Sequence, residues 1–194
     1  MSAKNKNVDI KNYVIYWKMR NWKSMLATCI ATEFDVIYAN YEIKHKNKNI
    51  SILIQKTRDL ARIKYTAQKA VLVFDEAWIN FNSKDSRSKN SRFLQNLLML
   101  CWKLNLNIIW IGQRWKSIDV NVRDLCTDIY QVRKINRRNY PIFMIDIKKR
   151  GKHIDEVLTN RTIRADLIMW LKEDNITYDT FAISQLDKIE KEKK

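Results

Sequence analysis

The stretch Val71-Leu72-Val73-Phe74-Asp75-Glu76 decides the fold of this chain. Four consecutive apolar residues predict a strand that is buried on both faces of a sheet. Two adjacent carboxylates follow at its carboxyl end, where burial is costly unless a positive charge meets them. Mg²⁺ on a nucleotide phosphate meets this need in a Walker B strand, where Asp75 would hold the metal through water and Glu76 would orient or deprotonate the attacking water. The alternative for this stretch alone is a strand that ends in a solvated acidic turn.

Length and composition predict a single domain over residues 1–194, with its core at about 12–150 and a charged tail at 186–194. Lys and Arg number 37 against 21 Asp and Glu, a net charge of +16. This balance favours a polyanionic partner, either nucleic acid or an anionic membrane surface, and the alternative is a solubility charge in a Lys-rich and Asn-rich proteome. Three cysteines in apolar contexts, without metal-ligand spacing, predict reduced core thiols.

Strands alternate with helices along the chain, which predicts a mostly parallel α/β sheet. We expect strands at 12–16, 34–38, 70–74 and 107–113, and two more at 128–135 and 142–147 at the sheet edge. We expect helices at 24–33, 50–65 and 92–104, a helical turn at 117–124, a loop or edge at 40–49, a polar loop at 80–90 and irregular chain at 151–166. Ligands bind at the carboxyl ends of such strands, where Lys23/Ser24, Asp75/Glu76 and Gln113/Arg114 fall.

Residues 17–24 match a phosphate-binding loop, G-x-x-x-x-G-K-[ST], except at its two glycines. Lys23 and Ser24 are in place, with a strand before and a helix after, but Trp17 and Trp22 occupy both glycine positions. Backbone N–H groups must close around the phosphates there, and a side chain fills that space. As printed, the loop therefore predicts an inactive site. The alternative is an ordinary strand–turn–helix with exposed aromatic residues.

One cause explains these tryptophans together with the composition. Glycine occurs twice, where average usage of about 7% would give roughly 14, and tryptophan occurs seven times. A gene whose host reads UGA as glycine, translated under a code that reads UGA as tryptophan, would show this pattern. We predict that codons 17 and 22 are UGA and that the native residues are glycine. Trp78 is a third candidate, whereas Trp110 lies in a buried strand that suits an aromatic residue.

Four motifs, in order and spacing, resemble those of the zonula occludens toxin-like (Zot-type) ATPases. The matching stretches are Ile15 to Thr28, Ile37-Tyr38-Ala39-Asn40-Tyr41, Phe74-Asp75-Glu76-Ala77, and Asn105 to Arg114, with Ser117 to Asp124 as a further match. They cover roughly residues 12–135. These ATPases serve assembly and export in filamentous phages and are related to the FtsK/HerA DNA-pumping class. The resemblance implies a P-loop NTPase fold (RecA/FtsK-HerA-like), a mostly parallel central sheet flanked by helices, and an ATP-driven motor for phage DNA export and virion assembly.

The resemblance also implies roles for the matching residues. Lys23 would neutralise the β- and γ-phosphates of ATP, Ser24 and Asp75 would hold Mg²⁺, and Glu76 would be the catalytic base. Gln113 would sense the γ-phosphate or position water, and otherwise it is a strand cap. The candidates for an arginine finger reaching the next subunit are Arg123 first and Arg114 second, and otherwise both make surface or nucleic-acid contacts. The implied nucleotide-binding residues are Trp17, Lys18, Met19, Arg20, Asn21, Trp22, Lys23, Ser24 and Met25.

The implied partners are phage DNA on the basic surface, further copies of the chain in a hexameric ring, and a membrane assembly partner. Family members usually continue into a membrane span, but no apolar run here reaches the ~18–20 residues of a span. We therefore expect a protein of the host cytoplasm, acting at the inner face of the membrane. Two alternatives remain open. One is a catalytically inactive homologue that binds nucleic acid or an assembly partner, and the other is a virion DNA-packaging ATPase of the same superfamily.

Overall fold

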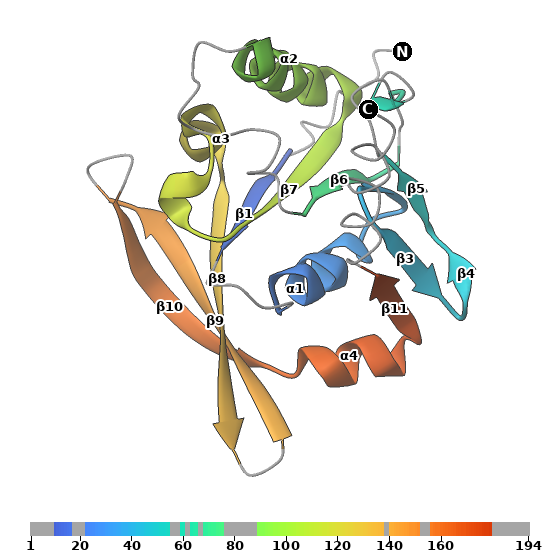
Figure 1. Ribbon diagram of the computed structural model, residues 1–194, viewed down its shortest axis with the longest axis vertical. Helices are drawn as coiled ribbons and strands as arrows, with labels where there is room; N and C mark the ends of the chain where they lie inside the picture. Colours follow the sequence, from blue (N-terminus) through green and yellow to red (C-terminus); the bar gives the residue numbers. More distant parts are fainter. Residues whose placement is uncertain are drawn as a thin grey trace, which may run out of the picture.

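The computed structural model describes residues 10–16, 22–54, 59–60, 63–65, 68–75, 89–137, 140–151 and 156–179. Its centre is an eight-stranded sheet in the order β10-β9-β8-β1-β7-β6-β2-β5 (Figure 1). The strands are β1 (Asn12–Tyr16), β2 (Val36–Ala39), β5 (Ser51–Leu53), β6 (Ala70–Phe74), β7 (Leu106–Gly112), β8 (Asp128–Arg137), β9 (Tyr140–Arg150) and β10 (Val157–Ala165). Pairing is parallel from β8 to β5 and antiparallel between β8, β9 and β10.

Helices cover both faces of this sheet. α2 (Lys89–Leu104) and α3 (Val120–Leu125) lie on one face, and α1 (Trp22–Ala31) and α4 (Leu167–Glu173) lie on the other (Figure 1). A second, antiparallel sheet in the order β11-β3-β4 is formed by β11 (Ile176–Asp179), β3 (Glu42–His45) and β4 (Lys48–Asn49). In the described part of the chain no helix has the length and hydropathy of a membrane span.

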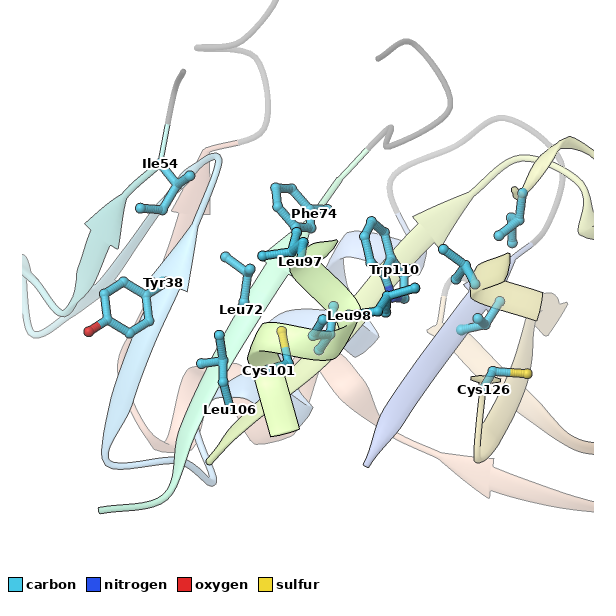
Figure 2. Close-up of a cluster of buried hydrophobic side chains, with 14 of the residues drawn as sticks. Tyr38, Ile54, Leu72, Phe74, Leu97, Leu98, Cys101, Leu106, Trp110 and Cys126 are labelled. Atoms are coloured by element: carbon cyan, nitrogen blue, oxygen red, sulfur yellow. The ribbon is translucent and has the colours of Figure 1, made fainter. Parts of the chain in front are cut away.

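The apolar run at 70–74 is continuous because β6 contributes to two cores. Leu72 and Phe74 face the core under α2, where they lie near Leu97, Leu98 and Cys101 (Figure 2), whereas Val71 and Val73 face the core under α1. Every residue of β6 and of β7 is buried. The prediction of a strand buried on both faces is therefore confirmed, and it follows from a central position in a parallel sheet.

Trp110 is a core aromatic residue of β7. It is 1% exposed, stacks on Phe74 with ring centroids 5.0 Å apart, and donates from Nε1 to Asn12 Oδ1 at 2.8 Å. A buried indole needs such a partner for its N–H group. The three cysteines are free and buried, as predicted, and burial raises the pKa of the Cys29 and Cys101 thiols to about 12 and that of Cys126 to about 11.

The helix predicted at 50–65 is wrong where the structure describes that segment. Residues 51–53 form β5, which pairs with β2, and of the rest only 50, 54, 59–60 and 63–65 are described, without an α-helix. Ser51 is the buried residue of β5, and its hydroxyl accepts a hydrogen bond from Ile43 N and donates one to Tyr41 O. Ile50 and Ile52 are 37% and 48% exposed, so their spacing does not mark a buried face. Pairing with β2 outweighs the local pattern.

Two predictions at the other edge also need correction. Residues 157–165 are not irregular but form β10, the outermost strand beyond β9. The residues between its two ends are exposed, so β10 shows no alternation of apolar and polar residues that could have revealed a strand. As a result β8 and β9, which were expected at the sheet edge, are interior strands, and β8 pairs directly with β1.

The segment 40–49, predicted as loop or edge, carries β3 and β4 of the second sheet.

Candidate functional site

The carboxyl ends of β1, β7 and β6 meet at one edge of the sheet. β7 lies between the other two, with Tyr16 of β1 paired to Gly112 and Phe74 of β6 paired to Trp110. All three strands are parallel, so the polar residues that follow them share this edge. α1 follows β1 in the chain, Gln113 follows β7, and Asp75 follows β6. The expected convergence of three polar clusters is therefore present in the topology.

Ser24 of α1 donates a hydrogen bond from Oγ to Oδ2 of Asp75. The two residues are 51 positions apart in the chain and both are buried. Lys23, the preceding residue, is buried beside them in the first turn of α1. Backbone N–H groups at a helix N-terminus favour an anion such as a phosphate. A lysine, a hydroxyl and a carboxylate thus lie together at the start of α1.

These groups suit Mg²⁺ and a phosphate in their chemistry. Mg²⁺ takes oxygen ligands and keeps several waters, so one hydroxyl and one carboxylate match its needs better than nitrogen or sulfur would. Within the described residues there is no cluster of three or more His, Cys, Asp or Glu side chains that could hold a metal ion. The phosphate-loop residues Trp17, Lys18, Met19, Arg20 and Asn21, and the expected base Glu76, lie outside the described residues.

Trp22 begins α1, and its indole packs against the β8–β9 part of the sheet. Its ring lies 5.1 Å from that of Phe143, and the Lys134 ammonium lies 4.7 Å from the Trp22 ring centroid. Phe143 is fully buried, while Lys134 is exposed. The side chain at position 22 therefore has its own packing site on the sheet. Met25, another expected nucleotide contact, is partly buried and packs against the core under α1.

Gln113 is partly exposed at the end of β7, between the strands that precede the phosphate loop and Asp75. The turn after it packs tightly on this strand end, since a Cβ atom on Gly112 would lie 2.9 Å from Ile118 Cγ1. Arg114 is exposed beside Gln113. Arg123, in contrast, is 7% exposed, donates from Nε to Ile118 O at 3.0 Å and lies over the Trp115 ring at 5.8 Å.

Sequence reasoning missed Asn40, which follows β2 and contacts Asp75 through both of its amide atoms. It also missed the neighbouring pair of Tyr41 and Thr28, whose hydroxyl oxygens are 3.1 Å apart. Burial raises the pKa of Tyr41 well above its usual range, and the negative charge of Asp75 adds to the shift. A polar residue directly after the buried strand at Ile37-Tyr38-Ala39 was the available signal for Asn40.

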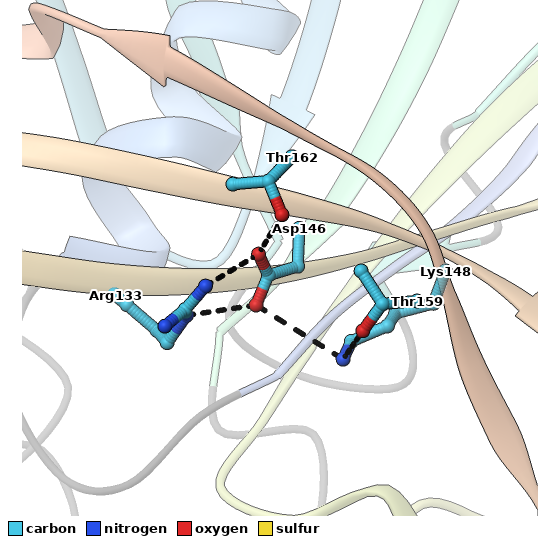
Figure 3. Close-up of polar contacts among 5 residues, drawn as sticks. All are labelled: Arg133, Asp146, Lys148, Thr159 and Thr162. Carbon is cyan, nitrogen blue, oxygen red and sulfur yellow. Dashed lines mark hydrogen bonds and ion pairs between the residues drawn. The ribbon is translucent and has the colours of Figure 1, made fainter.

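A second missed cluster surrounds Asp146 on β9 (Figure 3). Arg133 donates from Nε and Nη2 to the Asp146 carboxylate, both at 2.8 Å, and Thr162 donates at 2.6 Å. Lys148 lies 4.0 Å away and donates to Thr159. Burial raises the pKa of Asp146, but the bonds from Arg133 and Thr162 outweigh it and hold this pKa below its ordinary value of 3.8. The cluster joins β8, β9 and β10 into one unit.

Comparisons with known proteins now bear on this arrangement. No curated protein matches the chain. The genome-packaging NTPase B204 of Sulfolobus turreted icosahedral virus 2, solved with ATP-gammaS, is 13% identical with a TM-score of 0.48, covering 81% of this chain and 99% of that one. The N-terminal domain of zonular occludens toxin from Neisseria meningitidis is 12% identical with a TM-score of 0.44, covering 88% and 94%.

The flagellar accessory protein FlaH from Methanocaldococcus jannaschii is 12% identical with a TM-score of 0.43, covering 73% of this chain and 81% of that one. With identities this low and TM-scores below 0.5, these solved structures assign neither a fold nor a role to this chain. The family comparison is different in kind, because it aligns the sequence itself. The family model for zonular occludens toxin (Zot) matches residues 20–166, most of the chain, including Ser24, Asp75 and Gln113. The chain, an α/β protein with a mostly parallel central sheet, therefore belongs to the Zot family.

Proposed function

We propose that this chain is the ATPase domain of a motor that moves phage DNA during export and virion assembly. The observation that carries the proposal is the hydrogen bond from Ser24 to the Asp75 carboxylate. It joins the residue after the phosphate-loop lysine to the acidic end of β6, and these are the two halves of a Mg-nucleotide site. Family membership supports the same reading, since the matched residues contain both halves.

In this proposal the residues act by position and charge. Lys23 neutralises the β- and γ-phosphates, Ser24 supplies a hydroxyl ligand for Mg²⁺, and Asp75 holds the hydrated metal. Glu76 orients the attacking water and accepts its proton. Gln113 follows the strand between the two halves of the site, which suits a residue that senses the γ-phosphate. Mg²⁺, when bound, supplies charge neutralisation at the phosphates.

Arg114 is the better candidate for an arginine finger that acts on the next subunit of a homo-oligomeric ring of six copies. Its side chain is exposed beside Gln113, whereas Arg123 is buried, bonded to Ile118 O and covered by Trp115. A finger must reach a neighbouring site, so an exposed guanidinium suits this role. The net charge of +16 suits a DNA backbone as the cargo. We place this motor in the host cytoplasm, at the inner face of the membrane beside an assembly partner.

One observation favours a second candidate, a catalytically inactive homologue. Trp22 is packed on Phe143 and Lys134 as a genuine tryptophan would be. A virion DNA-packaging ATPase would use the same nucleotide site as the export motor and would differ in acting without a membrane partner. A co-purifying membrane partner separates these two motors.

The experiment that tests the proposal uses the protein with Trp17→Gly and Trp22→Gly, called here the double-glycine variant. It should hydrolyse Mg-ATP, and adding Glu76→Gln should lower turnover by ~10²-fold while nucleotide binding stays intact, because only the general base is lost. Equal turnover with Glu76→Gln would remove Glu76 from the mechanism. A double-glycine variant that binds no nucleotide would favour the inactive homologue.

A further inference from the structure

Asn40 makes two hydrogen bonds to the backbone of one residue, Asp75. Its Nδ2 donates to Asp75 O at 2.9 Å, and its Oδ1 accepts from Asp75 N at 2.8 Å. A side-chain amide carries a donor and an acceptor side by side, so Asn40 makes the two hydrogen bonds that the backbone of a neighbouring strand would otherwise make to Asp75. The backbone ladder between β2 and β6 ends just before, with the pair Ala39 and Val73 and a bond from Asn40 N to Val73 O at 3.3 Å.

The bond to Asp75 O has a consequence for the next residue. That oxygen belongs to the peptide that links Asp75 to Glu76, and this peptide is planar. Fixing the direction of its C=O group therefore fixes the direction in which the backbone leaves Asp75. A carboxylate that must meet metal or water needs its backbone held within a small angular range. Asn40 supplies that restraint from outside the strand.

The neighbouring residue ties the same corner to α1. Tyr41 is fully buried, and its phenol oxygen contacts Thr28, one helical turn after Ser24. Ser24 in turn donates to the Asp75 carboxylate. Asn40, Tyr41, Thr28, Ser24 and Asp75 thus form a closed circuit of contacts between β2, α1 and β6. These contacts link the first turns of α1 to the carboxyl end of β6.

We propose that Asn40 is a positioning residue that holds the Asp75–Glu76 peptide in the orientation required for hydrolysis. This inference rests on the proposed ATPase function and adds to it a residue that touches neither nucleotide nor metal. It acts through the backbone of Asp75, and its contribution is to the turnover step rather than to ATP affinity.

The chain offers a matched control at the other end of the same strand. Asn107 donates from Nδ2 to Ala70 O at 3.0 Å, and its Oδ1 accepts from Lys11 N at 2.8 Å. It therefore braces the amino end of β6 as Asn40 braces the carboxyl end. Loss of either amide removes two hydrogen bonds, both to Asp75 for Asn40, and one to Ala70 of β6 and one to Lys11 for Asn107, so both variants should lose stability to a similar degree. Only Asn40 lies at the site.

The test compares Asn40→Ala, Asn40→Asp and Asn107→Ala in the double-glycine variant. Asn40→Ala should lower kcat by about 10- to 10²-fold while the Kd for ATP changes less than about twofold, because the peptide loses its orientation but the phosphate loop is untouched. Asn107→Ala should leave kcat unchanged. Asn40→Asp keeps the acceptor for Asp75 N–H and loses the donor to Asp75 O, so it should lower kcat as Asn40→Ala does.

A second measurement needs no ATPase activity and uses the protein with tryptophan at positions 17 and 22. Amide hydrogen exchange at Asp75 should be faster in Asn40→Ala than in the parent protein. The exchange rate should stay the same in Asn40→Asp, which keeps the acceptor for Asp75 N–H, and in Asn107→Ala. Unchanged exchange at Asp75 in Asn40→Ala overturns the brace itself. An equal loss of kcat in Asn40→Ala and Asn107→Ala overturns the positioning role. A double-glycine variant without ATP hydrolysis overturns the proposed function and the catalytic part of this inference together, while the exchange result still decides whether Asn40 holds the peptide.

Discussion

Trp22→Gly is the substitution with the most informative consequence for stability. The indole is partly buried, against Phe143 and under Lys134. A partly buried tryptophan removes roughly 100–150 Å² from water, which at about 25 cal/mol per Å² is roughly 3 kcal/mol. The aromatic pair and the cation–π contact each add about 0.5–1 kcal/mol. Because the unfolded chain already buries some of this area, we expect a net loss of about 3 kcal/mol.

The assay is urea unfolding of the protein without nucleotide, followed by the same measurement with Mg-ATP. Lys134→Met is the control, since it removes the charge over the ring and keeps the aliphatic stem, and should cost no more than about 1 kcal/mol. Mg-ATP at 100 times its Kd should then restore about 2.7 kcal/mol to the double-glycine variant and nothing to the protein as printed. A loss below about 1 kcal/mol for Trp22→Gly would refute the packing argument.

Two further predictions concern other regions of the molecule. Asp146→Asn should cost about 1–3 kcal/mol at pH 7, because Arg133 and Thr162 lose a charged acceptor. The pKa of Asp146 is lower in the folded than in the unfolded protein, so its contribution to stability is present above the unfolded value of about 3.9 and is lost as pH falls through the folded pKa. The difference in unfolding free energy between the parent protein and Asp146→Asn should therefore be smaller at pH 3 than at pH 7, and an equal difference at both pH values would contradict this. Binding to DNA should be independent of sequence and should weaken steeply with salt, as measured by anisotropy, and no binding at low salt would return the net charge of +16 to a role in solubility.

Two central strands, β1 and β6, could be predicted to the residue, and the bounds expected for β7 differ by one residue. A strand in the middle of a parallel sheet is covered on both faces, so it contains a nearly continuous apolar run. β5 and β10 could not be found in this way. Both are edge strands: β5 has only three residues, of which the buried one is the polar Ser51, and the residues between the two ends of β10 are exposed, so neither shows a hydrophobic period. β5 pairs with β2, and β10 pairs with β9, the strand that directly precedes it in the chain.

The site divides along similar lines. Ser24 and Asp75 belong to motifs with a fixed order, so their convergence could be expected before their contact was seen. Asn40 lies in a stretch that matches the family, but a single asparagine after a strand has many ordinary explanations, and only its two bonds to Asp75 give it a role. The same holds for Asp146, whose hydrogen-bond partners come from the two neighbouring strands, β8 and β10. Arg123 was the first candidate for the arginine finger because of its place in a motif, and the sequence did not show that its side chain is buried.

Direct titration of Mg-ATP into the double-glycine variant tests the central claim, that Lys23, Ser24 and Asp75 form a nucleotide site. The account predicts binding with a Kd below about 1 mM, the usual range for enzyme substrates. It also predicts at least tenfold weaker binding when Lys23→Met removes the charge and keeps the buried stem, and no binding by the protein as printed. Equal affinity with and without the Lys23 charge, or no binding by the double-glycine variant, would contradict the account.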